Sequence, residues 1–398
     1  MAILKNAYPL ILLMVLATGL TSCYTEFDPH IDSTPVLCMN STVTPGEPVT
    51  LFLTRTWEWT EGNEYDLDLD VRNAEVRLIV NGEYKETLKP ATVENPYYMS
   101  NPYPKQRECY QSDYLPESGD IIRLEAQSEQ YGDASAEVMV PYPVPFDRLA
   151  TENLSCRLLQ GDISRFPIAE ESCVFELKFN LLAYLTDSAK DTDYYDIMAG
   201  LTNSYDNDDE TYAYLYSNNY PMLDFSGEPL LREHVSVLES AVSDIYGYSI
   251  FSDRQINGRT YPLRIEVNQF TFLYRNPLDL PGPKEFGIKV TLRHTDPVYY
   301  RHMISVWEGN YGITGALGGV GLASPVYPYS NVSTGAGTVA AYAEASLTIS
   351  IADLIAIAQQ GKSTEDCICR SACMRCASRK TRPLHTMLCR GRSCASGT

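Results

Sequence analysis

Short segments in which hydrophobic and polar residues alternate make up much of the first 140 residues of the chain. Such alternation is typical of strands that bury one face. The dipeptide Asn81-Gly82 follows one of these segments directly, and Asn-Gly readily adopts the positive φ angles of a two-residue hairpin turn. The pattern predicts roughly seven strands, of which the clearest are Val36–Ser41, Val49–Thr54, Glu75–Val80, Ile121–Ala126 and Ala134–Val140.

A proline cluster, Pro141-Tyr142-Pro143-Val144-Pro145, follows the last of these strands. Proline cannot donate to a sheet ladder, so the cluster is expected to end the strand and act as a linker. Short strands at this spacing are typical of an Ig-like sandwich. We therefore predict an Ig-like β-sandwich over residues 36–142 and a larger antiparallel β-rich domain over residues 146–360. Strands predicted in the second domain are Cys173–Leu181, Tyr194–Leu201, Thr211–Tyr216, Tyr261–Val267 and Phe286–Arg293.

One segment of the second domain has helical periodicity. Asp296 can cap a helix by accepting a backbone hydrogen bond, and Pro297 suits its first turn. A second short helix is predicted over Ile351–Gln359, whereas the glycine-rich stretch Gly312–Gly321 is expected to form a flexible loop. The fold class predicted is mainly β with one or two short helices. The first helix is supported by apolar residues at helical spacing, namely Tyr299, Tyr300, Met303, Ile304 and Trp307.

The first 22 residues have the order of a secretory signal peptide. Lys5 is followed by the mainly apolar run Leu10–Leu20, which is shorter than the roughly 20 residues that a membrane helix needs. Leu20-Thr21-Ser22-Cys23 resembles the lipobox of bacterial lipoproteins. The resemblance implies cleavage before Cys23, whose thiol is then thioether-linked to diacylglycerol with acyl chains such as palmitate, and residues 23–35 would form a tether. Two or three acyl chains anchor a protein stably to a membrane.

Acidic residues follow the lipobox cysteine at Glu26 and Asp28. This pattern resembles the surface-export signal of Bacteroidetes lipoproteins, which would place the protein on the outside of the cell. The alternative is a plain acidic tether.

The chain is strongly acidic, with a formal net charge of −20. Its last 36 residues are basic, so the remainder is more acidic than the whole. A surface of this charge repels nucleic acid and anionic membranes, which excludes nucleic acid as a partner.

Catalytic signatures are missing from the sequence. It contains neither H-E-x-x-H nor G-x-S-x-G, and Gly361-Lys362 lacks the earlier glycine of a phosphate-binding loop. We therefore expect no enzymatic activity, no catalytic residues, no metal site and no cofactor. A hydrolase site assembled from distant segments remains an alternative, and a pocket holding a carboxylate beside His234, His294 or His302 would support it.

Two groups of aromatic residues are candidates for stacking on glycans or peptides. They are Tyr212, Tyr214 and Tyr216, which alternate, and the pair Trp57 and Trp59. Residues two apart share one face of a strand, and rigid rings give contact area at low entropic cost. The alternative, cross-strand packing of the rings, is the commoner use.

The cysteines of the body are Cys38, Cys109, Cys156 and Cys173. Export permits disulfides, and pairing within domains would give Cys38–Cys109 and Cys156–Cys173, although the sequence leaves three connectivities open. Buried, reduced thiols are the alternative. The segment 361–398 holds six further cysteines and loses the β pattern. We expect it to be unstructured or altered, for example by a frame shift, with a disulfide-bonded tail or a metal site as alternatives.

Several short segments, in one order along residues 23–350, resemble a known family. They are Val36–Met39, Leu115–Asp120, Val140–Val144, Phe251–Asp253, Asn257–Tyr261, Asp296–Trp307, Pro325–Val332 and Thr334–Gly337. Together with the lipobox they are similar to the Bacteroidetes lipoproteins of domain-of-unknown-function family 4249. The resemblance implies an Ig-like domain, a β-rich C-terminal domain and an outer-membrane location, often alongside TonB-dependent receptors. It implies no activity and no catalytic residues.

We therefore expect a lipid-anchored protein of the outer membrane that faces the exterior and assists a TonB-dependent transporter, with the membrane reached through its lipid. A structural or adhesive component of the cell surface is the alternative function.

Overall fold

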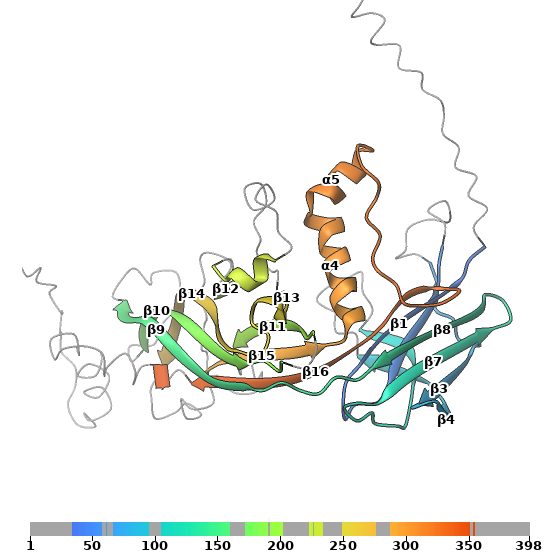
Figure 1. The fold of residues 1–398 in the computed structure, drawn as a ribbon, viewed down its shortest axis with the longest axis horizontal. Coiled ribbons are helices and arrows are strands. Elements are labelled where there is room, and N and C mark those ends of the chain that lie inside the picture. The colour runs from blue at the N-terminus through green and yellow to red at the C-terminus, as the bar shows by residue number, and fades with distance from the viewer. Residues whose placement is uncertain are drawn as a thin grey trace, which may run out of the picture. The chain divides into compact units, whose positions relative to one another are not determined.

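Antiparallel strands dominate the computed structural model, and the predicted mainly β fold is confirmed (Figure 1). Two short α-helices complete the part of the chain that the structure describes. The chain divides into the units Met1–Pro35 and Val36–Thr398, and all the elements lie in the second. The described residues are 34–57, 61, 67–94, 105–159, 172–189, 192–201, 223–225, 227–233, 249–275, 287–350 and 353–354.

Eight strands precede the proline cluster, and the five strands that alternation predicted are among them. Asn81 and Gly82 have φ angles of 53° and 82°, as the predicted hairpin turn requires. The eight strands are β1 (Leu37–Val43), β2 (Thr50–Arg55), β3 (Glu75–Val80), β4 (Glu83–Thr87), β5 (Lys89–Glu94), β6 (Gln106–Gln111), β7 (Ile121–Ser128) and β8 (Gly132–Met139).

The rest of the described chain contains longer strands, two short 3-10 helices and the two α-helices. Its elements are β9 (Phe146–Leu159), β10 (Ser172–Thr186), β11 (Tyr194–Leu201), β12 (Leu223–Asp224), η3 (Pro229–Arg232), β13 (Ile250–Ser252), η4 (Asp253–Gln255), β14 (Thr260–Arg275), β15 (Gly287–Thr295), α4 (Pro297–Tyr311), α5 (Ile313–Gly319) and β16 (Ala336–Ser350).

The strands form three sheets. One has eight strands in the order β13-β11-β15-β16-β1-β2-β6-β5, and the others have the orders β12-β14-β10-β9 and β4-β3-β7-β8. Strand β16 joins the two halves of the eight-stranded sheet. Its first residues pair parallel with β1, from Cys38↔Ala336 to Val43↔Ala341, and its remaining residues pair antiparallel with β15.

Two hydrophobic cores hold these sheets together. The first lies between β4-β3-β7-β8 and the end of the eight-stranded sheet that contains β1 and β2, and it includes Val339 and Ala341 of β16. The second lies between β12-β14-β10-β9 and the end that contains β11 and β15, and it includes Ile349 of β16. One strand thus contributes side chains to both cores.

The helix predicted to begin after Asp296 is confirmed as α4. The prediction of a flexible loop over Gly312–Gly321 is wrong, because α5 occupies most of that stretch. The predicted strand Thr211–Tyr216 and most of the predicted helix Ile351–Gln359 lie outside the described residues.

Candidate functional site

Helices α4 and α5 extend away from the sheets as an arm (Figure 1). Asp296 fixes the base of this arm. The buried Asp296 carboxylate accepts hydrogen bonds from the backbone amides of Val298 and Tyr299, each over 3.0 Å. It also accepts one from the amide of Ala341 in β16 over 3.0 Å. The residue that caps the helix therefore also ties its start to the sheet.

A second attachment joins α4 to β11. The hydroxyl of Tyr299 donates to Asp196 over 2.8 Å, and Ser249 donates to the same carboxylate over 2.6 Å. Burial raises the pKa of Asp196, although these two hydrogen bonds oppose the shift. The rings of Tyr194 and Tyr300 also pack with centroids 4.4 Å apart. The base of the arm is therefore rigidly built.

Glycines allow α5 to pack closely against the end of α4. A Cβ atom at Gly312 would lie 2.6 Å from the carbonyl oxygen of Glu308, and one at Gly315 would lie 2.5 Å from that oxygen. Side chains cannot be accommodated at such distances, so both positions need glycine.

The end of α5 has the hydrogen bonds of a glycine-terminated helix. Gly321 has a φ angle of 74° and donates from its amide to Gly318 over 3.0 Å, while the amide of Leu322 donates to Leu317 over 2.8 Å. These two bonds define a Schellman motif. The glycines of Gly312–Gly321 thus specify a packed, capped helix, which corrects the expectation of a loop.

The chain returns from α5 along α4 and is held to it near Tyr329. The amide of Tyr329 donates to the Ser305 hydroxyl over 2.6 Å, and its carbonyl oxygen lies 2.8 Å from Nδ1 of His302. The Thr338 hydroxyl at the start of β16 also donates to that carbonyl over 3.1 Å. The returning segment is thus anchored at its far end.

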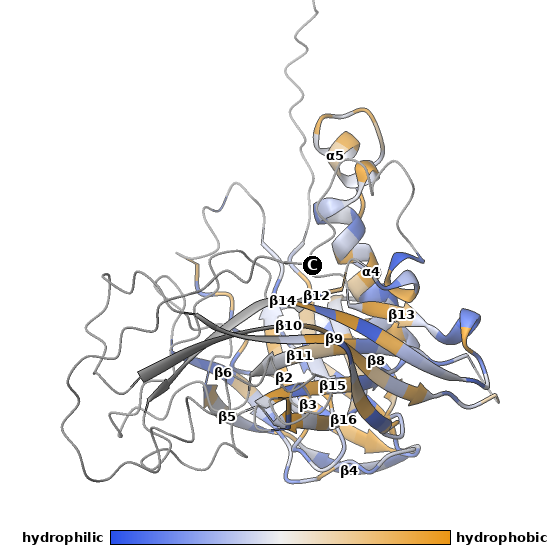
Figure 2. Cartoon of the chain, turned by 90° about the vertical axis from the view of Figure 1, so that its left-hand side faces the viewer, coloured by the Kyte–Doolittle hydropathy of each residue, from blue (hydrophilic) through white to orange (hydrophobic). Residues whose placement is uncertain are grey.

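The end of the arm exposes large apolar side chains. Val320, Leu322 and Tyr327 are 69%, 76% and 77% exposed, and Figure 2 shows hydrophobic residues in α5 and the loop after it. No residue between Glu308 and Glu344 is charged, although the chain has a net charge of −20. We call the exposed residues of this region the apolar tip: Tyr311, Leu317, Val320, Leu322 and Tyr327.

The apolar tip is the surface best suited to binding. Proteins that act alone rarely leave several large apolar side chains exposed close together, because contact with water is unfavourable, and such patches mark interaction sites. The aromatic residues that the sequence suggested for stacking on glycans or peptides did not include any residue of the apolar tip. The uncharged stretch in an acidic chain was the signal that could have identified it.

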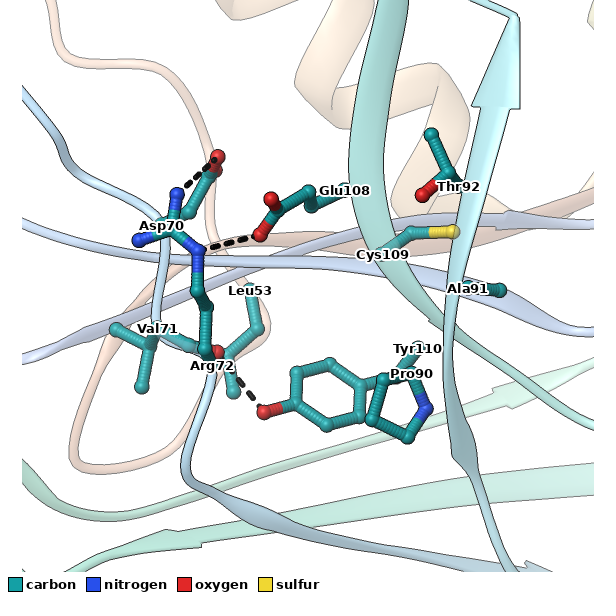
Figure 3. Close-up of a pocket in the computed structure, with 10 residues that line it drawn as sticks. All are labelled: Leu53, Asp70, Val71, Arg72, Pro90, Ala91, Thr92, Glu108, Cys109 and Tyr110. Atoms are coloured by element: carbon teal, nitrogen blue, oxygen red, sulfur yellow. Dashed lines mark hydrogen bonds and ion pairs between the residues drawn. The ribbon is translucent and has the colours of Figure 1, made fainter.

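A cavity of about 300 Å³ lies elsewhere, beside β2, β5 and β6 (Figure 3). Its volume is at the lower limit for small-molecule sites. Arg72 at its rim already pairs with Glu108 over 2.5 Å and with Asp68 over 2.7 Å, so a ligand anion would have to displace a carboxylate. Burial raises the pKa of Cys109, which also lines the cavity.

The structure brings none of the candidate stacking residues together within the described chain. Trp57 is exposed, whereas Trp59 and the alternating tyrosines Tyr212, Tyr214 and Tyr216 lie outside the described residues. The lipidation candidate Cys23 and the segment 361–398 also lie outside them.

Cys38 and Cys109 do not form a disulfide, and the backbone register separates Cys156 from Cys173. Cys38 and Cys109 are free thiols on β1 and β6, which β2 separates in the sheet. The alternative of a buried, reduced thiol applies to Cys109. The register of β9 and β10 pairs Cys156 with Leu177, four residues from Cys173, which is roughly 13 Å along a strand. Cα atoms must lie within about 7 Å for a disulfide.

Of the histidines that a hydrolase would need, His294 lies beside a carboxylate. Its Nε2 is 3.1 Å from Asp193, and its Nδ1 is 2.7 Å from the carbonyl oxygen of Tyr142. His302 contacts Tyr329 and Thr338 instead, and His234 lies outside the described residues. Both ring nitrogens of His294 therefore have a hydrogen-bond partner.

These features define a mainly β protein of packed antiparallel sheets with an uncharged helical arm. The chain belongs to the family described as Domain of unknown function (DUF4249), whose match covers residues 24–348. The predicted membership of domain-of-unknown-function family 4249 is thereby confirmed. Comparisons with curated proteins and with solved structures gave no match. Among the described helices, none is both long enough and apolar enough to cross a membrane.

Proposed function

We propose that this protein is a lipid-anchored, exterior-facing accessory of a TonB-dependent transporter in the outer membrane, and that the apolar tip docks onto the transporter. The observation that carries the docking is the exposure of Val320, Leu322 and Tyr327 at the end of a rigidly based arm. A partner that covers these side chains would remove their unfavourable contact with water.

The lipobox cysteine supports the membrane part of this proposal. Acyl chains on Cys23 would hold the protein at the membrane surface. The tether of residues 23–35 can span at most about 45 Å when fully extended. Confinement within this distance raises the effective concentration of the tip near a membrane-embedded partner, so a modest contact suffices for docking.

A protein partner fits the tip better than a lipid surface does. Helices that lie in a membrane interface carry lysine and arginine on their polar face. The tip has neither, since residues 309–343 are uncharged. The net charge of −20 also opposes approach to anionic headgroups. A transporter surface with apolar side chains meets no such repulsion.

The test is co-purification from detergent-solubilised outer membranes of cells that express the full-length protein. We expect the wild type to recover a TonB-dependent receptor and the double variant Val320→Ser/Leu322→Ser to recover at least 10-fold less, at equal expression. The control is Met139→Ser, because Met139 is an exposed apolar residue on β8, away from the arm. This control should recover the receptor as the wild type does.

Equal recovery by wild type and double variant would contradict docking through the tip. Failure of every form to recover a receptor would contradict the partnership and favour a structural or adhesive role. Mass spectrometry of the N-terminal peptide tests the anchor separately: an unmodified Cys23 or an uncleaved leader would overturn it.

A further inference from the structure

Three aspartates from separate parts of the chain meet at the edge of the second core. Asp187 directly follows β10, Asp193 directly precedes β11, and Asp253 begins η4. One carboxylate oxygen from each lies within 4.8 Å of the others. Backbone hydrogen bonds fix the three segments, since Asp253 donates to the carbonyl of Asp193 over 3.0 Å and Asp187 donates to that of Arg259 over 3.1 Å.

The surroundings of this acidic cluster (Asp187, Asp193 and Asp253) exclude most solvent. Asp187 is 5% exposed and Asp253 is 1% exposed. The ring of Tyr195 packs against Phe251 on one side, with centroids 5.2 Å apart, and against His294, with centroids 5.4 Å apart. Burying a carboxylate away from water costs folding free energy unless a hydrogen bond or an opposite charge compensates it.

Neutral donors satisfy part of the cluster. Asp187 accepts hydrogen bonds from the Tyr195 hydroxyl over 2.6 Å and from the amide of Gly258 over 2.9 Å. One oxygen of Asp253, Oδ2, accepts a hydrogen bond from the side chain of Asn257 over 3.1 Å. Nε2 of His294 lies 3.1 Å from Oδ1 of Asp193, and the two form an ion pair when the imidazole is protonated.

The second oxygen of Asp253, Oδ1, is the exception. It is buried and has no hydrogen-bond partner within the described chain. Buried polar atoms are nearly always satisfied, so an orphaned carboxylate oxygen inside a cluster of carboxylates points to a missing positively charged partner. Burial raises the pKa of Asp253, and the charges of Asp187 and Asp193 raise it further, which agrees with the lack of a partner for its Oδ1.

We propose that Asp187, Asp193 and Asp253 together bind a divalent cation, and that this cation is calcium. The unpartnered Oδ1 of Asp253 would be one of its ligands. Calcium takes oxygen ligands at 2.3–2.6 Å in flexible geometry, so two ligands on opposite sides of the ion lie about 4.8 Å apart. Oxygens within 4.8 Å of one another therefore fit around calcium without rearrangement of the backbone.

Other metals fit the donor set less well. Magnesium needs ligands at 2.0–2.1 Å in a near-octahedral arrangement, and zinc favours nitrogen and sulfur. His294 has the position of an outer residue that orients a ligating carboxylate through a hydrogen bond. The cation would cross-link the end of β10, the start of β11 and η4, and thereby stabilise the second core. This proposal is independent of the transporter hypothesis.

The test is thermal unfolding of the purified mature chain after treatment with EDTA, with and without added CaCl₂. We expect calcium at about 100-fold above its Kd to raise Tm by about 3 °C or more, because a ligand that binds only the folded state stabilises it. MgCl₂ at the same concentration should raise Tm less. Terbium, which substitutes for calcium, should luminesce through energy transfer from Tyr195, whose hydroxyl bonds to Asp187.

The deciding variant is Asp253→Asn, which removes one ligand charge but keeps the side-chain shape. We expect its Tm without calcium to equal or exceed that of the wild type, since one repulsive charge is gone, and its calcium-dependent rise to vanish. Asp193→Asn serves as the second variant and should also lose the rise. The control Asp68→Asn removes a carboxylate from the exposed group around Arg72 and should keep the full rise.

A wild type whose Tm does not respond to calcium would overturn the proposal. So would a rise that persists in both Asp253→Asn and Asp193→Asn, because calcium would then bind elsewhere. An equal response to magnesium and calcium would overturn the assignment of calcium.

Discussion

The backbone amide of Thr338 in β16 donates a hydrogen bond to the side-chain oxygen of Asn40 in β1 over 3.3 Å, although 298 residues separate the two. The contact belongs to the parallel pairing in which Ala336–Ala341 lie beside Cys38–Val43. The first core thus depends on a strand from near the end of the described chain. An N-terminal segment without that strand would expose the backbone groups of β1 as an open edge.

This dependence predicts the behaviour of fragments. Residues 36–142 alone should be less stable by about 3 kcal/mol or more than the same fragment fused through a flexible linker to residues 334–343, because Val339 and Ala341 fill the core. Urea unfolding followed by circular dichroism measures the difference.

The matched control for the fragment is the same fusion with Val339→Asp. It restores the length of the chain but places a charge in the core, and it should fail to stabilise the fragment. Identical unfolding midpoints for the fragment and the wild-type fusion would show that β16 is not needed.

Local patterns predicted the fold where short-range physics determines it. The alternating residues Glu75–Val80 correctly predicted strand β3 and both of its ends. Asn81-Gly82 correctly predicted the turn that follows it. Asp296-Pro297 gave the start of α4, since capping involves neighbours in sequence. The double role of β16 was not predicted, because pairing between distant strands leaves no local signal.

The candidate sites were harder to predict for the same reason. Asp187, Asp193 and Asp253 approach one another only because β10, β11 and η4 meet at one edge of the second core. The glycines of the arm were misinterpreted because glycine serves both flexible loops and close backbone contacts. Only the space around Gly315 in the structure distinguishes the two uses.

The close packing of α5 on α4 predicts opposite effects at two glycines. Gly315→Ala should destabilise the arm by about 1–3 kcal/mol, because the new methyl group would meet the backbone oxygen of Glu308 at 2.5 Å. Gly319→Ala is the matched control, since nothing lies within 4 Å of a Cβ there. It should be neutral or slightly stabilising, because alanine favours the helix.

Hydrogen exchange of the amides of α5 measures this effect directly, as the arm can open without global unfolding. We expect faster exchange in Gly315→Ala and unchanged or slower exchange in Gly319→Ala. Equal exchange in both variants would contradict the role of Gly315 in helix packing.

A pH-dependent contribution to stability is predicted at the turn that precedes β7. The hydroxyl of Tyr114 donates to Asp120 over 2.6 Å, and Asp120 also accepts from Asn81 over 2.9 Å. The hydrogen bond to Asp120, together with burial, raises the pKa of Tyr114 from 10.0 to about 12. Burial alone would raise the pKa of Asp120, but hydrogen bonds from Tyr114, the amide of Glu117 and Asn81 lower it overall.

The sign follows from proton binding. Between pH 10 and about 12 the folded state keeps the Tyr114 proton that the unfolded state loses, so stability falls as pH rises through this interval. Below pH 10 the hydrogen bond between Tyr114 and Asp120 makes its full contribution to stability. Allowing for the partial exposure of Tyr114, we expect the hydrogen bond to contribute about 1–2 kcal/mol at neutral pH.

The measurement is the free energy of unfolding in urea for the wild type and Tyr114→Phe, from pH 8 to pH 12. The difference between them should be constant up to about pH 10 and then shrink, because the other tyrosines are common to both proteins and cancel. In an Asp120→Asn background the same comparison should lose most of this pH dependence, since the carboxylate that holds the phenol proton is gone. A difference that stayed constant to pH 12 in both backgrounds would mean that Asp120 does not hold that proton, and that Tyr114 stabilises the turn only through packing.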